Sequence, residues 1–133
     1  MFHSIFVNMS IENLQRSMDF FSGLGFSFNP QFTDEQGTCM VISEHIYVML
    51  VEKAKYQTFT KKKIAERDTI EMALSFPCES PAEVRRLSEL AFSLGATKLE
   101  EPTDLGFMYS WGFEDLDGHA WDLFWMDPAH LES

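Results

Sequence analysis

The chain has 133 residues, enough for one compact domain with an ordinary hydrophobic core. It carries 21 acidic against 10 basic residues, a formal net charge of −11, which repels phosphate backbones and argues against nucleic-acid binding. No apolar stretch is long enough for a membrane span and no signal-peptide pattern is present, so we expect a cytoplasmic protein without a membrane partner.

The first half of the chain predicts a strand, a helix and three further strands. Ile5, Val7 and Met9 alternate with other side chains, as in a strand, and Ser10 offers an oxygen that can cap the next helix. The predicted elements are a strand over 3–9, a helix over 12–22, strands over 26–32, 38–43 and 45–52, and a turn at 34–37.

The same order then repeats after a polar connection over 53–69, which has room for a short helix. Ser80 and Pro81 are an N-cap and a first helical residue, and Gly95 closes that helix. The predicted elements are a strand over 70–76, a helix from Pro81 to about Ser93, strands over 97–101, 107–114 and 119–126, and a turn at 115–118.

The repeat predicts an α+β fold of two tandem βαβββ modules. The first module covers about 1–52 and the second about 70–128, within a single domain over 1–133. One module alone would leave a sheet face exposed, so we expect the two sheets to curl into a half-open mixed β-barrel with the helices outside. The concave inner face is then a natural site for a small molecule.

Motifs at both ends of the chain resemble those of a known family. Residues 11–21 (IENLQRSMDFF) resemble its opening helix, V-x-D-L-x-R-S-x-x-F-Y, and residues 24–26 resemble the "LGF" that follows. Residues 113–123 (FEDLDGHAWDL) resemble its closing hairpin, F-x-D-P-D-G-x-x-x-E-L. The chain therefore resembles the vicinal oxygen chelate superfamily, which contains glyoxalase, bleomycin resistance and extradiol dioxygenase proteins.

The resemblance implies a fold more sharply than a reaction, because one scaffold hosts many chemistries. Members include metal-dependent lyases, epimerases, ring-cleaving dioxygenases, thiol transferases and proteins that sequester drugs without catalysis. They commonly form homodimers. Trp121, Leu123 and Trp125 alternate on the last predicted strand and fit either helix packing or such an interface.

The metal-dependent members take ligands from the first and last strands of each module. By resemblance these positions fall on Phe6, Met49, Glu71 and Asp122. Phe cannot ligate and a thioether is a poor ligand for a hard ion, so the standard divalent metal site is incomplete and the cofactor is left open. None of the four histidines is expected to complete it; they are His3, His45, His119 and His130.

Three roles are possible for Glu71 and Asp122. They hold a metal weakly, they act as a metal-free acid and base, or they are inward polar groups that hydrogen bonds or water satisfy. The two cysteines, Cys39 and Cys78, belong to no metal-binding or disulfide pattern.

Five side chains are candidates for substrate binding. Tyr47 and Met49 point inward by the register of the family, and Asn8 lies on the first predicted strand. Tyr109 and Trp111 belong to an aromatic stripe on one face of residues 107–114. That stripe stacks a ligand if it is concave and is core beneath the helices if it is convex.

Three functions follow. The first is a protein that binds a small molecule in the sheet cavity, with lyase or isomerase activity from Glu71 and Asp122 where it is an enzyme. The second is a metal-dependent enzyme similar to lactoylglutathione lyase or to a dioxygenase. The third is a non-catalytic protein that sequesters a drug or metabolite.

Overall fold

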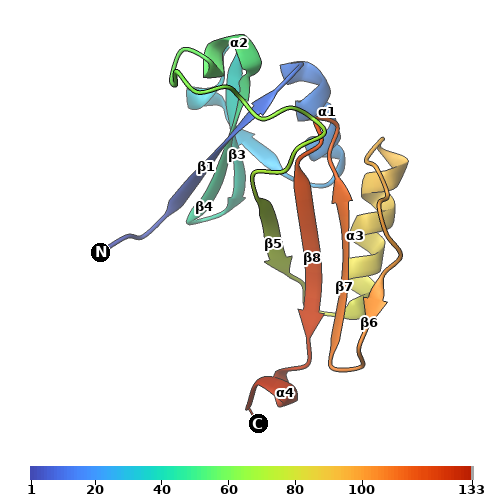
Figure 1. Cartoon of the computed structure of the whole chain (residues 1–133). Coiled ribbons are helices and arrows are strands. Elements are labelled where there is room, and N and C mark those ends of the chain that lie inside the picture. Colours follow the sequence, from blue (N-terminus) through green and yellow to red (C-terminus); the bar gives the residue numbers. More distant parts are fainter. Residues whose placement is uncertain (133) are drawn as a thin grey trace. The chain divides into compact units, whose positions relative to one another are not determined.

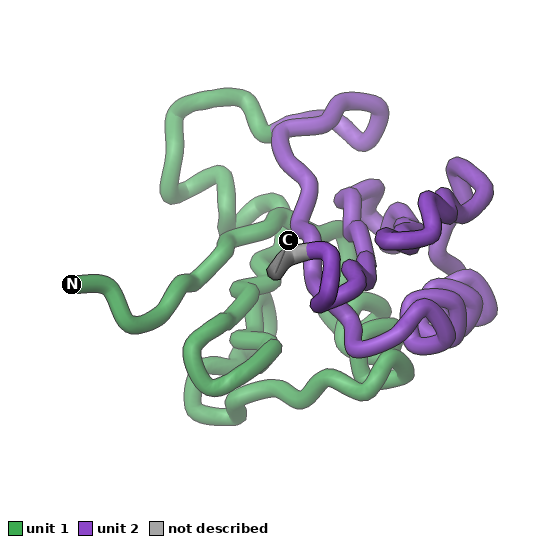
Figure 2. Tube along the Cα trace, turned by 90° about the horizontal axis from the view of Figure 1, so that it is seen from below, with its two compact units in different colours: residues 1–64 green, residues 65–133 purple. Residues whose placement is uncertain are grey.

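The structure, a computed structural model, describes residues 1–132, which form two compact units, 1–64 and 65–132 (Figure 2). Each unit contains one strand–helix–three-strand module, so the α+β class and the tandem βαβββ order are confirmed (Figure 1). The strands form two separate four-stranded sheets, and hydrogen bonding does not close them into a barrel within residues 1–132. No described helix is both long and apolar enough to cross a bilayer.

Unit 1 is a mixed sheet with one longer helix. Its sheet order is β1-β4-β3-β2, with β1 parallel to β4 and the other pairs antiparallel. Its elements are β1 (Ile5–Ile11), α1 (Leu14–Gly23), β2 (Ser27–Asn29), the 3-10 helix η1 (Pro30–Phe32), β3 (Gly37–Ser43), β4 (Ile46–Glu52) and α2 (Lys53–Tyr56).

Apolar side chains cover one face of the first sheet. A hydrogen bond also links the start of α1 to the end of β4. Met40, Val48 and Leu50 are fully buried, as expected for the face that a helix covers. The backbone N–H of Leu14 donates to Glu52 Oε2 at 2.9 Å, which satisfies one of the donors that a helix start leaves unpaired. The hydrogen bond thus fixes the start of α1 against the end of β4.

Unit 2 repeats the plan with a longer helix. Its sheet order is β5-β8-β7-β6, with β5 parallel to β8. Its elements are β5 (Ala73–Pro77), α3 (Pro81–Ser93), β6 (Thr103–Asp104), β7 (Met108–Glu114), β8 (Ala120–Met126) and α4 (Pro128–Glu132).

Helix α3 packs on one face of the second sheet, against β7 and β8 (Figure 1). Trp121 is 2% exposed and stacks on both Phe76 and Phe113, at ring-centroid distances of 5.7 and 6.3 Å. Phe92 of α3 meets the ring of Trp111 edge-on at 5.2 Å. The core of this unit is thus an aromatic layer between helix and sheet.

Several predicted boundaries are wrong, for local reasons. Ser10 does not cap α1, because β1 runs on to Ile11; the Asn13 side chain accepts from Arg16 N instead. The strand predicted over 26–32 ends at Asn29, where Pro30 starts a 3-10 turn.

In unit 2 the errors are larger. The strand predicted over 70–76 begins at Ala73, so Glu71 precedes it. The strand predicted over 97–101 is reduced to a bridge between Thr97 and Glu114, and the strand forms later, as β6. The helix over 81–93 and the turn over 115–118 are confirmed.

We predict that Ser80→Ala lowers the free energy of unfolding by about 0.5–2 kcal/mol. The Ser80 hydroxyl accepts from the backbone N–H of Glu83 at 3.1 Å, and alanine leaves that donor without its cap. Urea unfolding measures the change. Ser93→Ala removes an exposed hydroxyl at the other end of α3 and should cost less than about 0.5 kcal/mol. Equal losses in the two variants would contradict the cap.

Candidate functional site

The face of the first sheet that α1 leaves open carries three of the expected binding residues. Asn8 and Met49 are direct partners in the parallel β1–β4 register, and Tyr47 lies two residues before Met49 on the same face. Phe6 stacks on Tyr47 at 4.6 Å and remains 52% exposed. The structure thus brings Asn8, Tyr47 and Met49 together on one apolar surface.

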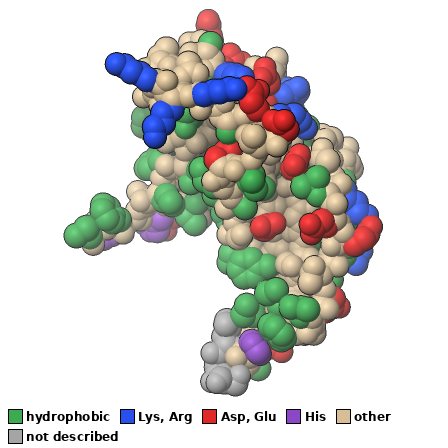
Figure 3. All heavy atoms as spheres, in the orientation of Figure 1, with side chains coloured by type: hydrophobic (Ala, Val, Ile, Leu, Met, Phe, Trp, Pro, Cys, Tyr) green, Lys and Arg blue, Asp and Glu red, His purple; other side chains and the backbone are tan. Residues whose placement is uncertain are grey.

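The open face of the second sheet holds a pocket of about 250 Å3. Its floor comes from β5, β7 and β8, and the chain between α3 and β6 forms its rim. The lining residues are Ser75, Glu100, Glu101, Thr103, Met108, Ser110, Trp111, Gly112, Asp122 and Phe124. Three of them are carboxylates, three are hydroxyls and none is basic. Figure 3 shows acidic side chains on the side of unit 2 that faces the viewer.

Asp122 lies in the middle of this floor. It is an exposed residue on β8, opposite Ser75 of β5 and Gly112 of β7. A Cβ atom at Gly112 would stand 2.5 Å from Asp122 Oδ1 and 2.7 Å from the carbonyl oxygen of Trp121. The missing side chain at Gly112 is therefore what gives the Asp122 carboxylate its space over the sheet.

The rim is tied to the sheet by Trp111. Its indole N–H donates to the carbonyl oxygen of Glu100 at 2.8 Å. Lys98 pairs with Glu101 at 2.8 Å and lies 5.5 Å from the centre of the Trp111 ring. One cation thus partly offsets the charge of the acidic rim.

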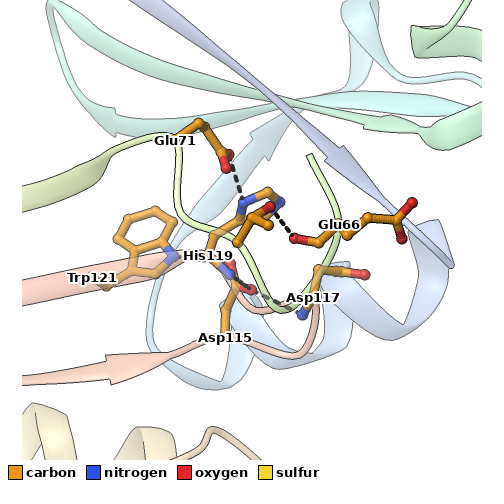
Figure 4. A network of polar contacts seen from close by, with 7 residues as sticks. Glu66, Glu71, Asp115, Asp117, His119 and Trp121 are labelled. Carbon is orange, nitrogen blue, oxygen red and sulfur yellow. Dashed lines mark hydrogen bonds and ion pairs between the residues drawn. The ribbon is translucent and has the colours of Figure 1, made fainter. Parts of the chain in front are cut away.

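The turn before β8 is organised by a buried carboxylate. Asp115 is 2% exposed; its Oδ1 accepts the backbone N–H groups of Asp117 and His119, at 2.9 and 3.0 Å, and its Oδ2 accepts the indole N–H of Trp121 at 2.9 Å (Figure 4). Burial raises the pKa of the Asp115 carboxyl, although nearby His119 and these hydrogen bonds act in the opposite direction. These hydrogen bonds fix the position of His119 and the start of β8.

Glu71 contacts His119, beside the turn (Figure 4). Glu71 Oε1 lies 3.4 Å from His119 Nδ1, and the two side chains are 42% and 14% exposed. Asp122 lies three residues further along β8, where its strand partner is Ser75, four residues after Glu71. The structure therefore pairs Glu71 with His119 and places Asp122 in the pocket that also contains Ser75 and Ser110.

Tyr109 and Trp111 lie on the face of β7 that α3 covers. They are 8% and 7% exposed, and Phe113 on the same stripe is 5% exposed. Of the two readings left open for this stripe, the core reading fits this placement. Trp121 and Leu123 are likewise buried in helix packing.

The donor set does not fit the metal site of the resembled family. Phe6 and Met49 occupy two of its four positions and cannot bind a hard ion. Within residues 1–132, no three His, Cys, Asp or Glu side chains gather closely enough to hold a metal ion. Thiolate chemistry is also disfavoured, because burial and then Glu83 raise the pKa of Cys78 to about 11.

Part of this site was missed from the sequence. Ser110 and Gly112 alternate with the aromatic stripe, so the pattern of β7 already separated them from the core face. The pairing of Glu71 with His119 had no signal, because it depends on the path of the chain before β5.

Comparison with solved structures places this fold. A hypothetical protein from S. aureus has 27% identity and a TM-score of 0.79, covering 93% of this chain and 94% of its own. A glyoxalase/bleomycin resistance protein/dioxygenase family enzyme from Burkholderia phytofirmans has 14% identity and a TM-score of 0.78, covering 91% of this chain and 96% of its own.

The fosfomycin resistance protein FosX from Mesorhizobium loti has 18% identity and a TM-score of 0.72, covering 100% of both chains. The chain therefore has the fold of the vicinal oxygen chelate superfamily, and the resemblance seen in its motifs is confirmed at that level. Comparison with protein families gave no match, and neither did comparison with curated proteins.

We predict that Gly112→Ala lowers the free energy of unfolding by about 1–3 kcal/mol, because the new methyl group meets the Asp122 carboxylate and the Trp121 carbonyl. Urea unfolding measures the loss. Asp122→Ala should return only part of it in the double variant, since the carbonyl clash persists. Gly106→Ala is the comparison at a glycine with open space, where the positive φ of 83° alone opposes the change. An unaltered Gly112→Ala protein would refute the close approach.

We predict that Asp115→Asn costs about 1–3 kcal/mol of unfolding free energy at pH 5. An amide nitrogen would face the Trp121 indole N–H, so two donors would meet. The raised pKa means that folded Asp115 keeps its proton above the ordinary value of 3.8, so wild-type stability falls as pH rises from there through the raised pKa.

Asparagine cannot titrate, so the variant should lack that slope and its deficit should shrink toward higher pH. Urea unfolding from pH 4 to pH 8 measures both effects. Asp127→Asn, which alters an exposed carboxylate that caps Ala129 N, serves as the control. A deficit that grows as pH rises would contradict the raised pKa.

Proposed function

We propose that the protein binds a small cationic or hydroxyl-bearing molecule in the pocket on the open face of the second sheet. The observation that carries the proposal is the exposed Asp122 carboxylate on a floor that includes Ser75 and Ser110. Carboxylates and hydroxyls accept hydrogen bonds from amines and alcohols, and a charged acceptor makes the stronger bond.

The charge of the lining supports this ligand class. Glu100, Glu101 and Asp122 line the pocket, and the cation at its rim, Lys98, is already paired with Glu101, so the lining favours a cation over an anion. The net charge of −11 adds attraction for cations at long range. Apolar contacts for the rest of the molecule come from Met108 and Phe124.

Binding without reaction, as in sequestration, and catalysis would both begin with a ligand held beside Asp122. The proposed acid–base role of Glu71 and Asp122 in a lyase or isomerase is favoured by one observation: Glu71 has His119 as a partner for proton exchange at 3.4 Å. The donor set gives no comparable support to a metal-dependent lyase or dioxygenase.

Binding is tested by thermal shift and calorimetry with benzylamine and spermidine, and with benzoate as the anionic counterpart. We expect the amines to stabilise the protein and benzoate not to. A probe at 100 times its dissociation constant adds about 2.7 kcal/mol. Asp122→Asn should weaken amine binding about 10- to 100-fold, because a hydrogen bond to a charged group is lost.

Asp19→Asn is the matched control, since it neutralises an exposed carboxylate on α1, outside the pocket lining, and should leave the affinity unchanged. Equal amine affinity in wild type and Asp122→Asn would refute the binding site. Chromatography of the recovered probe separates the two forms of the proposal: an unchanged molecule supports sequestration, and a converted one supports an enzyme.

A further inference from the structure

A second pocket lies on the other side of the same sheet. It measures about 540 Å3 and is formed by the first two turns of α3, the turn between β6 and β7, and the ends of β7 and β8. Tyr109 lines it, whereas its neighbour Ser110 lines the Asp122 pocket. The two pockets share no lining residue, so they are separate sites.

Tyr109 brings an unsatisfied hydroxyl to this pocket. The residue is 8% exposed, and its hydroxyl is buried without a hydrogen-bond partner among residues 1–132. Buried hydroxyls in folded proteins nearly always have a partner, because leaving one unpaired costs free energy. A phenol in this state beside a cavity indicates an acceptor that a bound molecule supplies.

Arg85 provides a positive charge at the same place. Its guanidinium lies 5.9 Å from the centre of the Tyr109 ring, and its side chain is 53% exposed. Its partner Glu89, at 3.3 Å, is also on the surface, and such exposed pairs are weak. Arg85 can therefore turn from Glu89 to a ligand carboxylate. A ligand reaches the buried Tyr109 hydroxyl only where such a movement opens it to the pocket. The amino end of α3, at Pro81 and Ala82, adds the positive end of a helix dipole.

Asp104 provides a negative charge in the lining. One of its oxygens, Oδ1, accepts the backbone N–H of Gly106 at 2.9 Å, which holds the carboxylate in the turn between β6 and β7. The pocket thus offers both signs of charge. A simple anion would meet Asp104 and a simple cation would meet Arg85, so a molecule that carries both charges fits best.

The remaining wall is apolar and partly aromatic. Trp125, the ring of Tyr109, Pro81 and Ala82 line it. We propose that this pocket binds a small aromatic amino acid or a similar zwitterion. Its carboxylate contacts Arg85 and the Tyr109 hydroxyl, its ammonium group contacts Asp104, and its ring packs on Trp125.

Calorimetry with L-phenylalanine tests this site on the full chain. We expect a dissociation constant of about 1 mM or lower, the range for a ligand of this size. Benzoate and phenethylamine each lack one of the two charges and should bind at least about tenfold more weakly when compared in the Asp122→Asn protein, where the amine site on the open face is removed. Absence of L-phenylalanine binding at about 10 mM would overturn the proposal.

Two variants locate the binding. Tyr109→Phe should weaken L-phenylalanine binding about tenfold while the melting temperature of the free protein stays the same or rises, because an unpaired buried hydroxyl is removed. Arg85→Gln, at a half-exposed position, should weaken binding to a similar degree. Unchanged affinity in both variants would overturn the assignment.

Asp122→Asn is the matched control, because Asp122 lines only the pocket on the open face. It should leave the affinity for L-phenylalanine unaltered. A loss of binding in this control would move the amino acid to the other pocket and contradict the second site.

Discussion

The pairing of β7 with β8 is the constraint on which the second unit depends. It sets Gly112 opposite Asp122 and, one residue away, buries Trp111 and Trp121 under α3. A slip of one residue would exchange these faces, leaving a carboxylate in the core and indole rings in water. The same register therefore builds the aromatic core and leaves room for a carboxylate on the open face.

The sequence predicted the plan of this molecule well, since its evidence was periodic. Alternation in β7, the cap at Ser80 and the turn closed by Gly118 are local patterns, and each is present. Errors arose where the chain is irregular. The segment before β5 reads as a strand but instead carries Glu71 to His119. No pattern in the sequence reports such a path, because tertiary contacts fix it.

The candidate site could be predicted only in part. Asp122 follows from the resemblance of the last hairpin, but its setting follows from the glycine across the strand, which only the register reveals. For Tyr109 the sequence left open a ligand wall or core beneath a helix; the residue lies on the helix face, beside a second pocket. Homodimer formation and a cytoplasmic location, both expected from the sequence, stay predictions.

The most direct test of the central claim is an NMR map of backbone amide shifts on addition of benzylamine. The account predicts that the largest changes fall on the pocket floor, at Ser75, Ser110, Gly112 and Asp122. Changes confined to the first unit, or absent at an amine concentration that stabilises the protein, would contradict the role given to the open face of the second sheet.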